Sequence, residues 1–227
     1  MRKFKFLAIA LLGFGLSSIA LAEKKSGGDE EVTSDEEAQY QQIKLGKIDE
    51  FKPTWKNAKE IQDSVTAFET KLNEVNSSIK EAAGIAQDAP LEKAFADMKE
   101  TAGDKIKVTI DSGKMPSLSA EDAPDNVKAF VDAVNAGVET CKSVIEGAKE
   151  MPGQIQTLIE EAKGMPSQLT PSILRDNGLK AKDLKQQKAV IAGNIEALKQ
   201  TKGRAQGVLG AAEDIVTQVK SLTPAKR

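Results

Sequence analysis

The sequence has no histidine, and its 227 residues include one cysteine, four arginines and nine aromatic residues. Without histidine, haem ligation through that residue, Ser-His-Asp or Cys-His catalysis and most zinc sites are excluded or nearly so. The single cysteine, Cys141, excludes an internal disulfide. Because aromatics make up only 4% of the chain, Ala, Val, Ile and Leu must build the core. These side chains suit narrow contacts between helices better than the broad interior of a β-sandwich.

Residues 1–22 have the layout of a secretory signal peptide, with a basic start, an apolar run and Ala20-Leu21-Ala22 as the cleavage site. The alternative is a signal anchor that stays in the membrane, but the apolar stretch reaches only about 15 residues, short of the roughly 20 that span a bilayer. We expect cleavage after Ala22, no lipid anchor because no cysteine is near, and a periplasmic or secreted protein without a transmembrane segment in the mature chain.

The mature chain is expected to contain one domain between two polar ends. Hydrophobic residues at 40% and charged residues at 29% are typical of a folded domain. Residues 23–34 read as a flexible polar tail and residues 223–227 as a C-terminal tail. Between them, residues 35–222 are predicted to form a single helical-bundle domain.

The clearest helical pattern runs from Thr54 to Ala86. Its apolar residues recur at steps of three and four: Ala58, Ile61, Val65, Phe68, Leu72, Val75, Ile79, Ala82 and Ala86. This heptad stripe predicts a helix packed in a bundle or coiled coil. Pro53 and Thr54 are consistent with a helix start, or with a kink after a shorter helix at residues 35–50.

A second pattern covers residues 91–110. Leu91, Phe95, Met98, Ala102, Ile106 and Ile110 are spaced as on a helix, although Ile106–Ile110 also alternates like a strand. Because no partner strand is evident, the fragment is interpreted as helix. Gly113, Pro116 and Pro124 mark a longer connection.

A third pattern begins near Asp125 and continues to Ile173. It contains a repeat, Ala148-Lys-Glu-Met-Pro-Gly-Gln-Ile155 against Ala162-Lys-Gly-Met-Pro-Ser-Gln-Leu169, at a spacing of 14 residues. Pro152 and Pro166 fall on the apolar stripe, so the region is either one long helix kinked twice or shorter helices in series. The unbroken heptad phase favours the kinked rod.

The last pattern runs from about Lys180 to Leu222. Lys188 and Lys202 interrupt its stripe, and they could reach solvent, pair across helices or limit self-association. Gly203, Gly207 and Gly210 lie on or near the stripe, where small residues would let another backbone come close. The chain is therefore predicted to be all-α, an elongated antiparallel bundle of three to five long helices with coiled-coil-like heptad seams.

The distribution of charge indicates contacts between helices. Residues 175–227 carry a net charge of +6 and residues 23–174 a net charge of −11. A basic last helix beside acidic earlier helices is typical of interhelical ion pairs. A basic face toward a membrane or nucleic acid is the alternative, but arginine is scarce and the secretory route removes nucleic acid as a partner.

No catalytic, cofactor-binding or metal-binding residue is predicted. Cys141 lies on the apolar stripe and is interpreted as a buried core residue. Met115, Met151 and Met165 each precede a proline but lie too far apart in sequence for a thioether copper site. Trp55 is interpreted as closing one end of the core, with a partner-binding anchor as the alternative.

These observations predict a non-enzymatic, exported helical-bundle protein that acts as a binding, scaffold or spacer component of the cell envelope. Two alternatives stay open. One is a lipid-handling protein whose amphipathic helices open onto a membrane. The other is a periplasmic export chaperone. The protein or lipid partner and the oligomeric state are not specified by the sequence.

Overall fold

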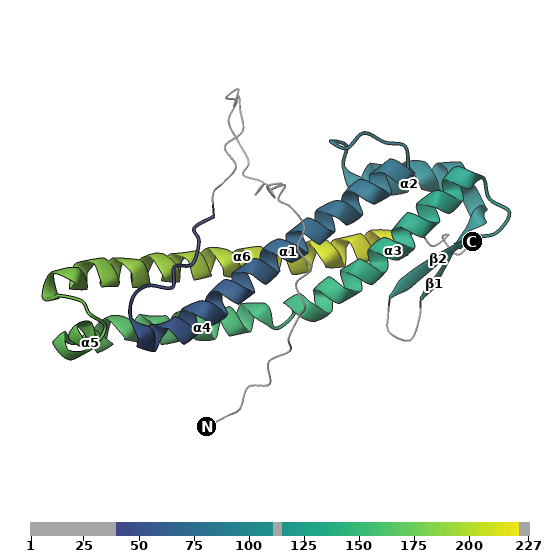
Figure 1. The fold of residues 1–227 in the computed structure, drawn as a ribbon. Coiled ribbons are helices and arrows are strands. Elements are labelled where there is room, and N and C mark those ends of the chain that lie inside the picture. The colour runs from purple at the N-terminus through teal and green to yellow at the C-terminus, as the bar shows by residue number, and fades with distance from the viewer. Residues whose placement is uncertain (1–39, 111–114, 223–227) are drawn as a thin grey trace, which may run out of the picture. The chain divides into compact units, whose positions relative to one another are not determined.

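The structure is a computed structural model (Figure 1) that describes residues 40–110 and 115–222. The chain divides into two units, residues 1–38 and 39–227, and all of the described residues belong to the second unit. The predicted signal peptide at 1–22 and the predicted tails at 23–34 and 223–227 lie outside the described residues.

The described chain is mostly helical, with one small two-stranded sheet. The expected helical class is thus correct in its coarser form, and the two strands were missed. In chain order the elements are η1 (Asp49–Phe51), α1 (Lys52–Ala82), α2 (Leu91–Ala102), η2 (Gly103–Lys105), β1 (Ile106–Ile110), β2 (Pro116–Ala120), α3 (Asp125–Ala148), α4 (Met151–Gln168), α5 (Pro171–Asp176), η3 (Ala181–Asp183) and α6 (Leu184–Ser221).

Prolines and glycines place most of the helix ends. Pro53, Pro152 and Pro171 occupy the first positions of α1, α4 and α5, where the missing N–H has no helical partner to lose. Gly84 adopts a positive φ of 69° just after α1. This left-handed turn is easiest for glycine, and it ends α1 before Ala86, where the apolar stripe had suggested the end.

Contacts along α1 fix the directions of its neighbours. From Phe68 to Val75 on α1, the facing positions on α3 fall from Gly147 to Gly137, so the two helices are antiparallel. Along α6 the facing positions rise instead. Gln62 contacts Thr201 and Glu69 contacts Arg204, so α1 and α6 run in the same direction.

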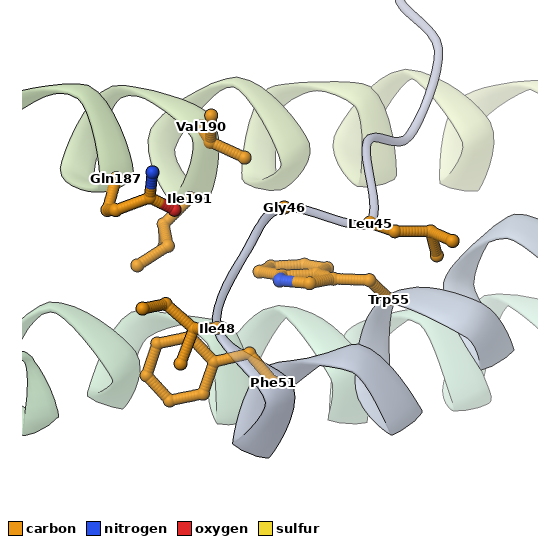
Figure 2. Close-up of a pocket in the computed structure, with 8 residues that line it drawn as sticks. All are labelled: Leu45, Gly46, Ile48, Phe51, Trp55, Gln187, Val190 and Ile191. Carbon is orange, nitrogen blue, oxygen red and sulfur yellow. The ribbon is translucent and has the colours of Figure 1, made fainter. Parts of the chain in front are cut away.

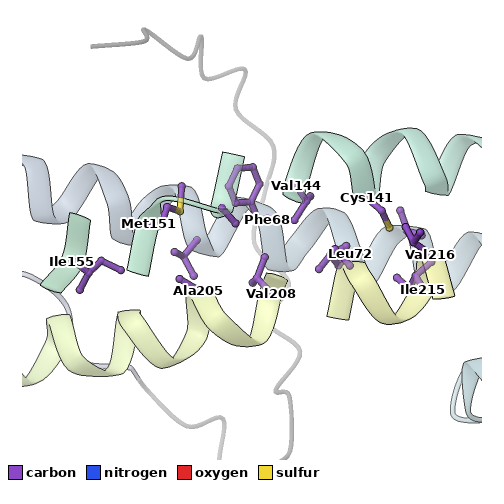
Figure 3. Packing of buried hydrophobic residues seen from close by; sticks show 14 of the residues in the cluster. Phe68, Leu72, Cys141, Val144, Met151, Ile155, Ala205, Val208, Ile215 and Val216 are labelled. Carbon is purple, nitrogen blue, oxygen red and sulfur yellow. The ribbon is translucent and has the colours of Figure 1, made fainter. Parts of the chain in front are cut away.

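Small aliphatic side chains build the core, as the composition predicts. Trp55 is 1% exposed and lies near Ile48 and Ile191 where α1 begins (Figure 2), which confirms its prediction as a core residue. Farther along, Val, Leu, Ile and Ala from α1, α3, α4 and α6 interdigitate (Figure 3). The predicted stripe on α1 is confirmed from Val65 to Ile79. Before it, Gln62 is buried and Ile61 only partly buried, and at its end Ala82 is partly buried and Ala86 is exposed beyond the helix.

The helical prediction at residues 106–110 is wrong. Ile106–Ile110 forms β1 and pairs antiparallel with β2, with Val108 opposite Leu118. The missing partner lay in the stretch around Pro116 that had been interpreted as a connection. The α2 helix ends at Ala102 because Gly103 turns the chain with a φ of 54°.

The helix expected at residues 35–50 is also absent from its described part. Residues 40–48 are not helical, and only the short η1 precedes α1. Gly46 has a φ of 70°, which interrupts a helical course there.

The kinked rod expected across residues 125–173 is replaced by helices in series. The α3 helix ends at Ala148, α4 starts at Met151 with Pro152 in its first turn, and α5 starts at Pro171. Pro166 lies inside α4, near its end. The heptad phase continues across the breaks because each helix still has to turn its apolar side to the same core.

The close backbone approach expected at the glycines of α6 occurs elsewhere. A Cβ on Gly203, Gly207 or Gly210 would meet nothing within 4 Å. Gly137 and Gly147 of α3 are tight against α1, since a Cβ there would lie 2.9 Å from the Val75 side chain or 2.5 Å from the Phe68 ring, and Gly193 of α6 is tight against the Gln41 side chain at 2.8 Å. Gly137 and Gly147 allow α3 to pack closely on α1.

Gly147→Ala is accordingly expected to lower the free energy of unfolding by about 1–2 kcal/mol, because the buried Phe68 ring has to move. Gly153→Ala in α4 is the matched control. Its Cβ enters open space, so the better helix propensity of alanine should raise stability by up to about 1 kcal/mol. Urea denaturation of both variants measures the difference, and a stabilising Gly147→Ala would contradict the close packing.

Candidate functional site

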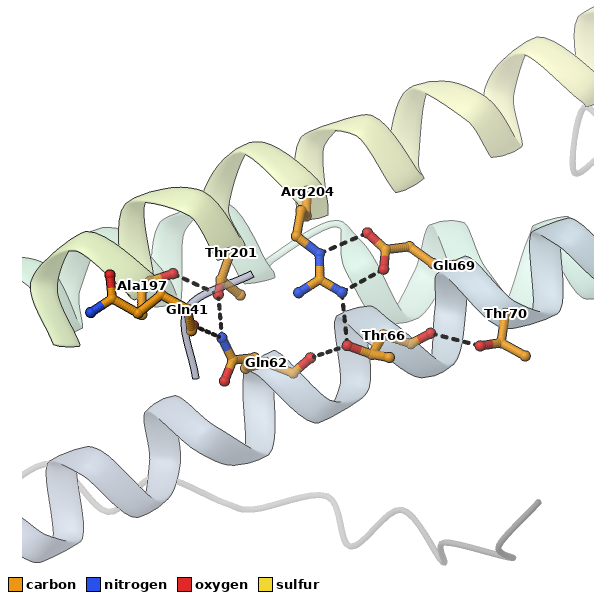
Figure 4. Close-up of polar contacts among 8 residues, drawn as sticks. All are labelled: Gln41, Gln62, Thr66, Glu69, Thr70, Ala197, Thr201 and Arg204. Carbon is orange, nitrogen blue, oxygen red and sulfur yellow. Dashed lines mark hydrogen bonds and ion pairs between the residues drawn. The ribbon is translucent and has the colours of Figure 1, made fainter. Parts of the chain in front are cut away.

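Residues 40–48, here called the strap, lie against α1 and α6 without forming a helix or strand. Residues in an extended stretch without a sheet need partners for their backbone groups, because unpaired buried amides are costly. In the strap, side-chain amides from α1 and α6 supply those partners. The arrangement is seen in part in Figure 4, where Gln41 of the strap lies beside Gln62 and Thr201.

Gln62 of α1 bonds two residues of the strap at once. Its Oε1 accepts from the Ile43 N–H at 3.1 Å, and its Nε2 donates to the Gln41 carbonyl at 2.9 Å. The same Nε2 donates to Thr201 Oγ1 of α6 at 3.3 Å. Gln62 is 2% exposed and Thr201 is fully buried, so the amide is held in place by both long helices.

Asn194 of α6 bonds both backbone groups of the next strap residue, Lys44. Its Oδ1 accepts from the Lys44 N–H at 2.9 Å, and its Nδ2 donates to the Lys44 carbonyl at 2.6 Å. Gln200, on the surface of α6, accepts from the Gln41 N–H at 3.1 Å. Three side-chain amides therefore make five hydrogen bonds to the strap backbone, as a neighbouring β-strand would.

Two aliphatic side chains of the strap complete the attachment. Ile43 and Ile48 are 6% and 2% exposed, whereas Leu45 between them is 45% exposed. Gly46 makes the turn that returns Ile48 to the core, and its left-handed φ explains why a glycine stands there. We call the surface of α1 and α6 that holds these groups the strap groove.

An ion pair closes the groove at its Tyr40 end. Arg204 of α6 donates through Nε to Glu69 of α1 at 2.9 Å and through Nη2 to Thr66 at 2.8 Å (Figure 4). The side chains of Arg204 and Glu69 are only 8% and 17% exposed, and the guanidinium stacks on the Tyr40 ring at 4.2 Å. This pair bears out the expectation of an ion pair between the basic last helix and an earlier helix. A planar Arg is well suited to bond a carboxylate and stack on a ring together.

The groove leaves no room for a small molecule beneath the strap. The cavity among Trp55, Phe51, Gln187 and the strap is about 10 Å³ (Figure 2), the space of roughly one water. A much wider groove of about 700 Å³ lies between α1 and α3, but it is an open surface depression. Its lining residues include Lys71, Glu74 and Glu139, each exposed.

Of the side chains weighed in the sequence, Trp55 lies beneath the strap, whereas Cys141 and the two methionines of α4 are not part of the site. Cys141 is fully buried in α3, and desolvation raises the pKa of its thiol to about 11, so the reactive thiolate is suppressed at neutral pH. Met151 and Met165 are buried at opposite ends of α4. Among residues 40–110 and 115–222, no three Asp, Glu, Cys or His side chains gather as metal ligands.

The residues that build the strap groove were not predicted from the sequence. A signal was present, because Gln62, Gln187, Asn194 and Thr201 are polar residues at buried positions of otherwise apolar helix faces. Lys202, which does interrupt the α6 stripe, donates to Gln156 of α4 at 2.9 Å, and Lys188 is exposed to solvent.

No described helix is both long and apolar enough to cross a membrane. Comparison of the chain with protein-family models, curated proteins and solved structures finds no match.

Proposed function

We propose that this is a non-enzymatic, exported helical-bundle protein that serves as a binding, scaffold or spacer component of the cell envelope. We further propose that it binds an extended polypeptide segment in the strap groove. The observation that supports this most directly is the set of amide-to-backbone bonds from Gln62, Asn194 and Gln200. Residues 1–22 support export, and the antiparallel packing of α1 on α3 supports the bundle.

The chemistry of the groove favours polypeptide as the ligand. Side-chain amides that bond N–H and C=O groups read the backbone, which every polypeptide has, so they tolerate many sequences. Selectivity comes from the positions of Ile43 and Ile48, where the groove buries an aliphatic side chain. A ring at the Tyr40 position stacks on Arg204. The preferred ligand is an extended segment with an aromatic residue followed by aliphatic residues three and eight positions later.

An empty strap groove is energetically unfavourable. If the strap leaves, the buried amides of Gln62 and Asn194 lose their partners, and each unsatisfied group costs about 1–3 kcal/mol unless water replaces the strap. The tethered strap has an effective concentration in the millimolar range, so a competing segment binds weakly to the native protein. The strap thus acts as an intramolecular competitor.

Weakening the strap should expose this binding. Ile43→Asp places a carboxylate at a buried position and should detach the strap, so a fluorescently labelled peptide of residues 39–49 should bind at least about tenfold tighter than to the native protein. Gln42→Asp, at an exposed neighbouring position, is the matched control and should bind as the native protein does. Fluorescence anisotropy measures the affinities, with circular dichroism to verify that helix content is retained.

The peptide with its residues in scrambled order tests whether binding depends on the spacing of the aromatic and aliphatic positions. Equal binding of the strap peptide and the scrambled peptide, or no binding to a folded Ile43→Asp protein, would contradict the proposal. If Ile43→Asp loses its helix content, Tyr40→Ala provides a milder release, because it removes only the stacking on Arg204.

Other assays separate this function from its alternatives. Flotation with liposomes would favour lipid handling, which requires the helices to open because their apolar faces are buried together. Suppression of the aggregation of unfolded outer-membrane proteins would assign the groove to an export chaperone. A reproducible hydrolytic or redox activity of the purified protein would overturn the non-enzymatic role. Mass spectrometry of the protein from an envelope fraction tests cleavage after Ala22.

A further inference from the structure

We propose that β1 pairs with β1 of a second copy of this chain, so that two hairpins form one four-stranded antiparallel sheet. This surface is separate from the strap groove, and the proposal does not depend on the function proposed above. Its evidence is the direction in which the backbone groups of β1 point, the exposure of those groups and the pairing of the nearby charges.

The direction of the backbone groups follows from β2. The side chain of Asn135 on α3 accepts from the Leu118 N–H at 2.8 Å and donates to the Leu118 carbonyl at 2.9 Å. Leu118 therefore points its backbone groups away from β1. Val108 lies opposite Leu118, so its N–H and C=O point away from β2. Because alternate residues point the same way, those of Ile110 also face outward. Pro116, opposite Ile110, is consistent because proline has no N–H to give the ladder.

The outer edge of β1 is open at one end. Val108 is partly exposed and Ile110 is 53% exposed, one of the few large apolar side chains on the surface of the described chain. Within residues 40–110 and 115–222, no hydrogen bond joins this edge to another element. Ile106, at the other end, is only 3% exposed. The accessible pairing groups are therefore those of Val108 and Ile110.

The lysine of β1 is held in an ion pair within its own hairpin. Lysine on an edge strand discourages pairing. Lys107 instead forms an ion pair with Glu121, just after β2, with 2.9 Å between Nζ and Oε2. The hydrogen bond and the opposite charge raise the pKa of Lys107 and lower that of Glu121. Each copy thus pairs its own Lys107, so this lysine adds no unpaired positive charge where two copies approach.

A two-fold axis at Thr109 gives a hydrogen-bond partner to each accessible N–H and C=O group of Val108 and Ile110. It places Val108 of one copy opposite Ile110 of the other, and each such pair exchanges two hydrogen bonds. It also places Thr109 opposite Thr109, a favourable cross-strand pair. The other edge of the sheet is closed by Asn135, so the pairing ends with two copies and does not extend into a fibre. Figure 1 shows the hairpin with β2 on the side of α3.

The small size of this contact sets its strength. Three residues from each copy pair, which buries far less than the roughly 1,200 Å² of a standard stable interface. The dimer should therefore be weak and concentration-dependent, forming between about 10 µM and about 1 mM. Confinement in a thin compartment, or binding side by side to one partner, would favour the dimer because it raises the effective concentration of the chain.

Val108→Pro tests the pairing directly. Proline at this position removes an N–H that points outward and leaves the β1–β2 ladder bonds in place. The matched control is Val108→Thr, which keeps the N–H and the β propensity. Sedimentation velocity of purified protein over that concentration range should show dimer for the native chain and for Val108→Thr. Val108→Pro should dimerise at least about tenfold more weakly.

Ile110→Lys is a second test in case Val108→Pro disrupts the hairpin. Ile110 is exposed, so the substitution should not affect folding, and the lysine adds an unpaired charge to the edge. It should weaken the dimer like Val108→Pro while leaving the melting temperature unchanged. A native protein that stays monomeric up to about 1 mM would overturn the proposal. So would a folded Val108→Pro protein that dimerises as strongly as the native protein.

Discussion

Asn194→Asp is expected to detach the strap and to lower the free energy of unfolding by about 3 kcal/mol. The substitution keeps the size of the side chain but removes its only donor. Asn194 is 1% exposed, and its Nδ2 donates to the Lys44 carbonyl at 2.6 Å. Asp would bring a carboxylate oxygen against that carbonyl oxygen. The two would repel, and the buried carboxylate would keep one strap hydrogen bond, from the Lys44 N–H.

Gln200→Glu is the matched control for this prediction. It makes the same amide-to-acid change on the same helix, but the Gln200 amide only accepts in the strap, from the Gln41 N–H, and it is exposed. Glutamate retains the acceptor, so we expect a change within about 0.5 kcal/mol. Denaturant titrations give the two stabilities, and hydrogen exchange at the Lys44 amide reports release of the strap. Equal effects of the two variants would show that the donor of Asn194 is unimportant.

The sequence predicts the long helices well because burial on one face repeats along them. Val65, Leu72 and Ile79 on α1 follow the heptad steps and are all buried. The same argument predicts the start of α3 at Asp125. The apolar spacing of a helix face repeats over many turns, so one or two polar residues within it do not change the helix prediction.

Short elements are harder to predict because their partners decide them. Ile106–Ile110 fits both a helical and an alternating pattern, and the choice depends on pairing with Pro116–Ala120. The strap depends even more on distant residues, since the Asn194 that bonds Lys44 lies 150 residues away. The apolar helix face around Gln62 or Asn194 indicates burial, but the hydrogen-bond partner of each amide cannot be identified until the facing backbone is known.

The repeat at residues 148–155 and 162–169 shows how similar sequences take different roles. Both copies contain Ala-Lys-x-Met-Pro, yet Pro152 stands in the first turn of α4 and Pro166 near the end of the same helix. Both therefore mark a boundary of α4, from opposite sides. Since a proline in the first turn is favourable and one inside a helix is costly, the two positions should respond oppositely to alanine.

Pro166→Ala is expected to raise the free energy of unfolding by up to about 3 kcal/mol, because alanine restores an N–H that can bond the Ala162 carbonyl. Pro152→Ala should lower it by less than about 1 kcal/mol, since α4 begins there and proline fixes the starting φ. The midpoint of urea denaturation at an unchanged slope measures each effect. Equal gains in stability from both variants would instead favour the interpretation of residues 125–173 as one continuous helix kinked at the two prolines. No gain from Pro166→Ala would mean that the proline ring contributes as much to packing as the missing hydrogen bond costs.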